Sequence, residues 1–198
     1  MSSRALAWLI VGAWGCAVLR ADLPRTYVSA SARSPRGRLR VAVLPFANQT
    51  RWPQGQLLLY RAFLAELIRS GALDVVGEGD VRQLYIQRRI IPGRPLGEED
   101  LRALVDRLKV DVVISGRLLR MERSRREGEP DPLVAFWVRA LDPRGGRLLW
   151  STYHRRRGSD YRRFMRFGVV RSVTALCQRM CAEVVRDWRR HGLLRGAR

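Results

Sequence analysis

The fold is decided by the segment Leu101–Gly116, LRALVDRLKVDVVISG, in which a helical pattern runs directly into a strand pattern. Acidic side chains at 98–100 precede the helical part, where they complement the helix dipole. Val110–Gly116 is then apolar except for Asp111, as expected of a central strand. The helical part presents one apolar face, made of Leu101, Leu104, Val105 and Leu108. A helix that feeds a buried strand predicts an α/β domain.

Working outward from this segment, the same two periodicities predict the remaining elements. Strands are expected at 40–46, 73–76, 110–124, 133–140 and 147–153, and helices at 57–70, 80–90 and 98–109. Ser159 is a candidate cap for a last helix whose apolar face runs from Phe164 through Phe167 to Trp188. The order β-α-β-α-α-β-β-β-α predicts a single α/β domain with a mixed sheet flanked by helices.

The first residues have the pattern of an export signal. Ala5–Trp14 is an unbroken apolar stretch, too short for a membrane span, and it runs into Gly15-Cys16. A small residue before a cysteine is typical of bacterial lipoprotein signals, which predicts lipidation of Cys16. The alternatives are secretion with cleavage after Ala17 and an uncleaved anchor.

These patterns divide the chain into a lipoprotein-type signal peptide (1–15), a flexible tether (16–39), a binding domain (40–192) and a basic tail (193–198). The tether is rich in Ser, Pro, Gly and Arg and has no apolar periodicity. The predicted location is the periplasmic face of the outer membrane, or the periplasm if Cys16 carries no lipid.

The charge is high but not specific. The chain has 198 residues and a formal net charge of +20, and of its 38 basic residues only Lys109 is a lysine. Selection for phosphate contacts would use lysine as well as arginine, so this bias indicates GC-rich codon usage. An exported chain does not meet nucleic acid, and no aromatic side chains interleave with the basic run to stack bases. Nucleic acid is therefore disfavoured as a partner.

The sequence contains no recognisable catalytic motif. His154 and His191 are far apart, and no P-loop, nucleophile elbow or paired-carboxylate motif occurs. Cys177 and Cys181 lie four residues apart on a predicted helix face, where small core residues are favoured over a metal or redox pair. We therefore expect neither an enzyme nor a bound metal or cofactor.

The positions of several arginines are more informative than their number. If the last three strands form an antiparallel meander, one end of it gathers a set that we call the arginine rim, with Arg162, Arg163 and Arg166 beside it. Such a set is either a solvated hairpin end or a binding surface for lipid headgroups, cell-wall carboxylates or an acidic protein. The arginine rim consists of Arg120, Arg123, Arg125, Arg126, Arg155, Arg156 and Arg157.

Four segments resemble a known group of periplasmic lipoprotein domains. Val41–Thr50 (VAVLPFANQT) is similar to the opening strand and Pro-Phe-x-Asn-x-Thr loop of the CsgG-like, LpoB-like and TolB N-terminal domains. Leu73–Leu84 resembles their strand, acidic turn and helix, and Val138–Trp150 resembles their last hairpin. Leu101–Gly116 departs from the group at Lys109-Val110, where Gly-Ala is usual.

The resemblance implies a membrane-tethered module that docks or assembles another envelope component, without catalysis of its own. The alternatives are a secreted periplasmic protein that binds anionic lipid or cell wall, and a subunit of an enzyme or secretion complex. The identity of the partner and any self-association are left open, because members of one fold perform different tasks.

Overall fold

A mixed sheet forms the centre of the protein. A computed structural model describes residues 24–29, 38–162, 167–192 and 194. The strands follow the order β1-β9-β8-β5-β2-β4, and β3 pairs with β5 beside them. Pairing is parallel among β2, β3, β4 and β5 and antiparallel from β5 through β8 and β9 to β1. The strands are β1 (Arg25–Val28), β2 (Arg40–Val43), β3 (Ala47–Asn48), β4 (Asp74–Val75), β5 (Val112–Glu122), β8 (Leu133–Leu141) and β9 (Leu148–Arg157).

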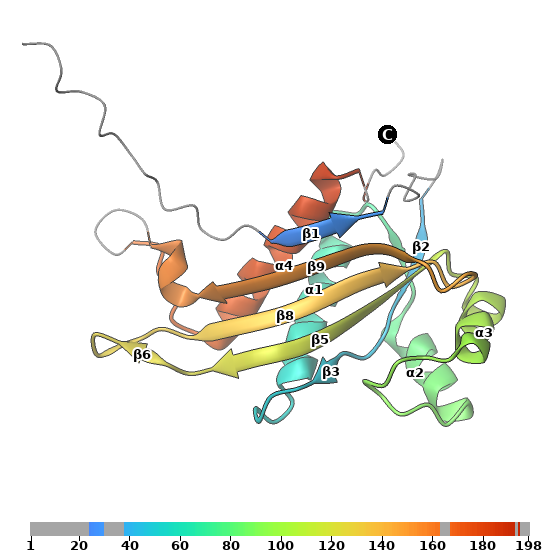
Figure 1. Cartoon of the computed structure of the whole chain (residues 1–198), viewed down its shortest axis with the longest axis horizontal. Helices are drawn as coiled ribbons and strands as arrows, with labels where there is room; N and C mark the ends of the chain where they lie inside the picture. The colour runs from blue at the N-terminus through green and yellow to red at the C-terminus, as the bar shows by residue number, and fades with distance from the viewer. Residues whose placement is uncertain (1–23, 30–37, 163–166, 193, 195–198) are drawn as a thin grey trace, which may run out of the picture.

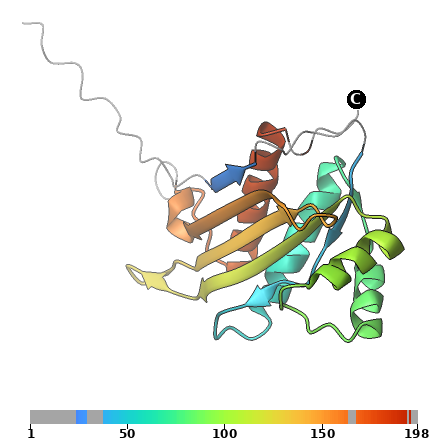
Figure 2. The ribbon, with the colours of Figure 1, turned by 45° about the vertical axis from the view of Figure 1, so that its right-hand side comes forward.

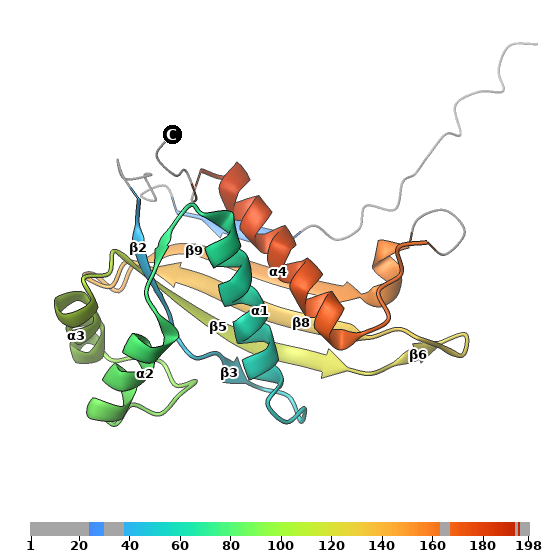
Figure 3. The same cartoon turned by 180° about the vertical axis from the view of Figure 1, so that it is seen from behind.

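Two long helices cover one face of this sheet. In Figure 3, α1 (Gly55–Ser70) and α4 (Val173–Arg190) lie side by side over it. Trp188 of α4 is fully buried, its ring meets Phe63 of α1 edge to face at 5.5 Å, and its Nε1 donates to Oγ1 of Thr152 in β9 at 2.8 Å. The main core therefore lies between this helix pair and the sheet.

Two shorter helices pack on the opposite face, at the β2 end. Successive residues of a strand point to opposite faces. Val41 and Val43 belong to the core under α1 and α4, whereas Ala42 and Leu44 contact α2 (Glu78–Gln87) and α3 (Glu98–Leu108) in a second core. None of the helices in the described ranges is long and apolar enough to cross a membrane.

The same face is open further along the sheet. We call this region, on the side of β5, β8 and β9 away from α1 and α4, the open face; no described helix lies in front of it (Figures 1 and 2). Because side chains alternate along a strand, neighbours of the buried residues Leu118, Phe136 and His154 face outward in this region. Its outward residues include Arg117, Arg120, Trp137, Arg139, Tyr153 and Arg155.

The predicted fold class and element order are confirmed. The nine predicted elements correspond to β2, α1, β4, α2, α3, β5, β8, β9 and α4. The structure adds the short strands β1 and β3, and a two-stranded hairpin of β6 (Arg125–Arg126) and β7 (Glu129–Pro130) between β5 and β8.

The predicted flexible tether is wrong for residues 25–28. These residues form β1, which pairs antiparallel with β9, with Arg25 opposite Tyr153 and Val28 opposite Trp150. Thr26 points toward the helix side, where its hydroxyl donates to the Asp187 carboxylate of α4. The folded domain therefore begins well before residue 40.

The predicted start of the last helix is also wrong. Ser159 lies in a 3₁₀ turn, η1 (Gly158–Tyr161), and α4 begins at Val173 with Ser172 as its cap, whose Oγ accepts from the Ala175 amide at 3.1 Å. Phe167 is 74% exposed and does not belong to the core. Phe164 lies outside the described residues.

Candidate functional site

The meander brings the two ends of the arginine rim together, as predicted. In the register of β5, β8 and β9, Arg120 and Arg155 stand on either side of Ala135 and point to the open face. Arg120 is exposed and pairs with Glu122 at 2.6 Å. Arg120 and Arg155 are therefore neighbours across β8 at this end of the sheet.

Arg156 does not belong to the exposed rim, contrary to the prediction. Its side chain is 4% exposed, because the alternation of β9 turns it toward α4. There its Nε lies 3.4 Å from Oε2 of Glu183, and its guanidinium lies over the ring of Tyr161. Arg157 is half-buried and lies 3.8 Å from the Asp131 carboxylate.

The remaining rim arginines extend the basic end beyond the sheet. Arg125 and Arg126 are exposed on the β6–β7 hairpin, and the guanidinium of Arg123 stacks over Trp52 at 4.7 Å from the ring centroid. Arg162 is exposed after η1. Cys16, Arg163 and Arg166 lie outside the described residues.

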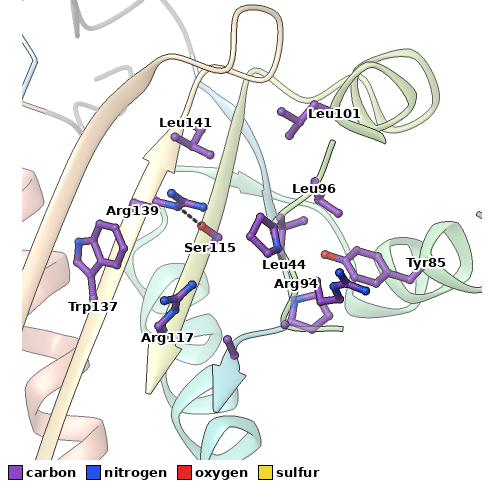
Figure 4. A pocket seen from close by; sticks show the side chains of 15 residues that line it. Leu44, Tyr85, Arg94, Leu96, Leu101, Ser115, Arg117, Trp137, Arg139 and Leu141 are labelled. Carbon is purple, nitrogen blue, oxygen red and sulfur yellow. Dashed lines mark hydrogen bonds between the residues drawn. The ribbon is translucent and has the colours of Figure 1, made fainter. Parts of the chain in front are cut away.

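A pocket that the sequence did not single out lies on the open face. Its volume is about 70 Å³, and it is built where β5 and β8 meet the connection between α2 and α3. Figure 4 shows Arg117 of β5 and Arg139 of β8 on the same side as the loop that carries Arg94. The rest of the wall is largely apolar, with Leu44, Tyr85, Leu96, Leu101, Trp137 and Leu141.

Arg139 is fixed within this pocket. Its Nε donates to Oγ of Ser115 on the neighbouring strand at 3.0 Å, and its guanidinium lies 5.5 Å from the ring centroid of Trp137. Burial lowers the pKa of Arg139, and the positive charge of Arg117 lowers it further. Arginine stays protonated under all physiological conditions, so the pocket keeps both positive charges.

Strand alternation could have pointed to half of this pocket. The sequence pattern of 133–141 already places Trp137 and Arg139 on the face opposite the core. Arg94 carries no such signal, because only the tertiary placement of its loop brings it to the sheet. The pocket was therefore missed at the sequence level.

The described residues offer little for catalysis. No group of three or more His, Cys, Asp and Glu side chains in these ranges is placed to hold a metal ion. Cys177 and Cys181 are buried free thiols, as predicted; burial raises the pKa of Cys177 to about 12 and that of Cys181 well above its ordinary value. A protonated, enclosed thiol is a poor nucleophile.

A buried polar cluster lies beneath the sheet, on the α4 side. Nε2 of His154 lies 2.6 Å from Oε2 of Glu183, and the same oxygen accepts a hydrogen bond from Nε of Arg156. Tyr161 packs against Arg156 and Arg179 on the edge of this cluster. Because His154 and Arg156 are almost fully enclosed, the cluster has a structural role between β9 and α4.

Comparison with known proteins gives similarity of fold. No protein-family model and no curated protein matches the chain. Among solved structures, a PelC dodecamer from Paraburkholderia phytofirmans has a TM-score of 0.58 and 17% identity over 88% of this chain and 98% of that chain. Lipoprotein GNA1162 from Neisseria meningitidis has a TM-score of 0.56 and 18% identity over 77% and 99%.

The LpoB C-terminal domain from Escherichia coli matches more distantly, with a TM-score of 0.42 and 14% identity over 58% of this chain and 80% of that chain. The predicted resemblance to a group of lipoprotein domains is confirmed as a similarity of fold by the match to lipoprotein GNA1162. At these identities the fold alone is shared, so the function must be argued from this chain's own surfaces.

Proposed function

We propose that the chain is a non-catalytic envelope lipoprotein, anchored through Cys16 to the periplasmic face of the outer membrane, whose open face docks another envelope component. The observation that carries this proposal is the open face itself, where aromatic and arginine side chains stand on three strands with no described helix over them. Aromatic residues and arginine are the types enriched in protein–protein interfaces. Two structures of similar fold support this proposal, since one is lipoprotein GNA1162 and the other is the PelC dodecamer.

The strand β1 limits how far the domain can stand from the membrane. Nine residue steps separate Cys16 from Arg25, the first residue of β1. An extended chain covers at most about 3.3–3.6 Å per residue, so this connection reaches roughly 30 Å. A lipid on Cys16 would thus hold the domain close to the bilayer, within reach of partners at the membrane surface.

The arginine rim lies near the end of the sheet at which β1 begins. Arg25 is opposite Tyr153, two positions before Arg155 on β9. The exposed rim arginines would then face anionic headgroups and add an electrostatic contribution to the lipid anchor. If Cys16 carries no lipid, the same rim supports the alternative function, a secreted periplasmic protein that binds anionic lipid or cell wall.

The anchor is tested by replacing Cys16 with serine. We expect Cys16→Ser to release a soluble periplasmic form and to abolish fatty-acid labelling, because the acylated thiol is gone. Fractionation and labelling of wild type and variant measure both effects. A wild-type protein without lipid whose mature chain starts at Val18 or later would contradict the anchored form of the proposal.

The rim is tested by salt-dependent binding to anionic liposomes. In the Cys16→Ser background, wild-type rim arginines should retain the protein on vesicles at low salt and release it as salt rises, because exposed charges are screened over about 8 Å at physiological ionic strength. We expect glutamine at Arg120, Arg123 and Arg155 to remove most of this retention. Arg156 is left intact because it is buried.

The matched control carries glutamine at three exposed arginines of the helices, Arg61, Arg82 and Arg186, and so has the same net charge. Retention of this control at the wild-type level shows that position matters rather than charge. Equal loss in both triple variants would mean that the arginines act only through the overall charge of the protein. A parallel series with peptidoglycan distinguishes cell wall from lipid.

A further inference from the structure

We infer that the pocket of Arg94, Arg117 and Arg139 binds a terminal carboxylate, the free chain end of a polypeptide whose last residue is apolar. This inference rests on the proposed docking function, since the pocket opens on the open face. It names the chemical group of the partner that the open face would recognise.

The first argument is unbalanced charge. Three guanidinium groups line the pocket, and no Asp or Glu is among its lining residues. Elsewhere in the described chain, arginines such as Arg88, Arg102 and Arg147 are paired with carboxylates within 4 Å, whereas none of the three pocket arginines has such a partner among the described residues. Like charges held together repel each other, and an anion between them removes that repulsion.

The second argument is the orientation of the donors. Ser115 engages Nε of Arg139, which holds the guanidinium plane and leaves its two terminal nitrogens to a ligand. Arg117 stands on the adjacent strand, diagonal to Arg139 in the register. Guanidinium groups bind carboxylates through paired N–H donors, and a guanidinium held in place loses less freedom on binding.

The third argument is the apolar part of the pocket wall. Leu44, Leu96 and Leu101 line the same small pocket. In a chain-terminal residue the carboxylate and the apolar side chain leave the same carbon atom, so one residue can contact both the arginines and the leucines of a pocket of about 70 Å³. An inorganic phosphate has no apolar group to place against the leucines, and the acyl chains of a lipid lie many bonds away from its phosphate. Capture of terminal carboxylates is a known mode of peptide recognition.

The test uses the full mature chain with Cys16→Ser and a matched pair of probes, N-acetyl-leucine and N-acetyl-leucinamide. Binding is followed by NMR titration of the arginine Nε–H and tryptophan Nε1–H signals. We expect N-acetyl-leucine to bind about tenfold or more tightly than the amide, because the charged hydrogen bonds are absent from the amide. N-acetyl-glutamic acid α-amide, whose only carboxylate is on the side chain, should bind like the amide probe.

Glutamine at Arg94 or at Arg117 should each weaken binding of N-acetyl-leucine by about tenfold, with the melting temperature unchanged. Arg94→Gln is the safer variant because Arg94 is exposed on a loop, and Arg120→Gln at the rim is the matched control that should bind normally. Equal binding of acid and amide, normal binding by both pocket variants, or stronger binding of inorganic phosphate than of N-acetyl-leucine would each overturn the inference. Intact lipid labelling and vesicle retention would leave the proposed function standing in that case.

Discussion

Replacing Trp188 by alanine is expected to lower the free energy of unfolding by about 3–5 kcal/mol, as large aromatic-to-alanine changes in cores do. Trp188 is fully buried between α1, α4 and β9, and it makes the edge-to-face contact with Phe63. Its removal leaves a cavity and also removes the hydrogen bond to Thr152. For a chain of this length the loss corresponds to a fall in melting temperature of roughly 6–20 °C.

The matched control is Phe167→Ala, which truncates an aromatic residue that is 74% exposed. Such a surface change is expected to alter the free energy of unfolding by no more than about 0.5 kcal/mol. Thermal and denaturant unfolding of both variants measure the difference. Equal effects of the two truncations would show that α4 does not pack against the sheet through the face that carries Trp188.

The misplaced start of α4 shows where helical periodicity misleads. Phe164 and Phe167 fit the apolar spacing of the later helix, and both Ser159 and Ser172 are good caps. The deciding contact is a close approach of two backbone segments: Val170 donates its amide to the Gly158 carbonyl, and a Cβ at Gly158 would lie 1.8 Å from the Val170 oxygen. No periodicity in the sequence reports such an approach.

Strand β1 was missed for a related reason. Its four residues, RTYV, are too few for alternation to be recognised between polar neighbours. What holds them is distant in sequence, the ladder with β9 and the contact of Thr26 with Asp187. The long strands β5 and β8 were predictable from their own residues, because β5 begins with an apolar run and β8 carries Val134, Phe136, Val138 and Ala140 on one face.

The sequence predicted the place of the arginine rim but not which arginines belong to it, since Arg156 is buried. Three successive arginines, 155–157, carry no contrast between apolar and polar residues, so the sequence could not say which of them faces the helices. The structure resolves this through Glu183 of α4, which lies opposite Arg156. Charge runs on a strand must therefore be divided by alternation before they are read as one surface.

Replacing Glu183 by glutamine is expected to destabilise the fold by about 3 kcal/mol or more. Oε2 of Glu183 is the acceptor shared by His154 and Arg156, whose side chains are 1% and 4% exposed. Removal of the carboxylate leaves the Arg156 charge buried without its partner, and loss of one member of a buried ion pair typically costs about 3–5 kcal/mol. Chemical denaturation at pH 7 measures the loss. Glu122→Gln, which removes the same charge from an exposed pair with Arg120, should cost at most about 1 kcal/mol.

The effect of Glu183→Gln should also depend on pH in a defined direction. Burial raises the pKa of Glu183, but the hydrogen bond and charge of His154 and the charge of Arg156 outweigh it and hold the pKa below its ordinary value. A depressed carboxylate pKa stabilises the fold above the unfolded value of about 4.3, and this contribution is lost as the pH falls through the lower folded value. The difference in free energy of unfolding between wild type and variant should thus be full at pH 7 and shrink below about pH 4. A difference that stays constant from pH 7 to pH 3 would mean that Glu183 stabilises the fold through its shape rather than through its charge.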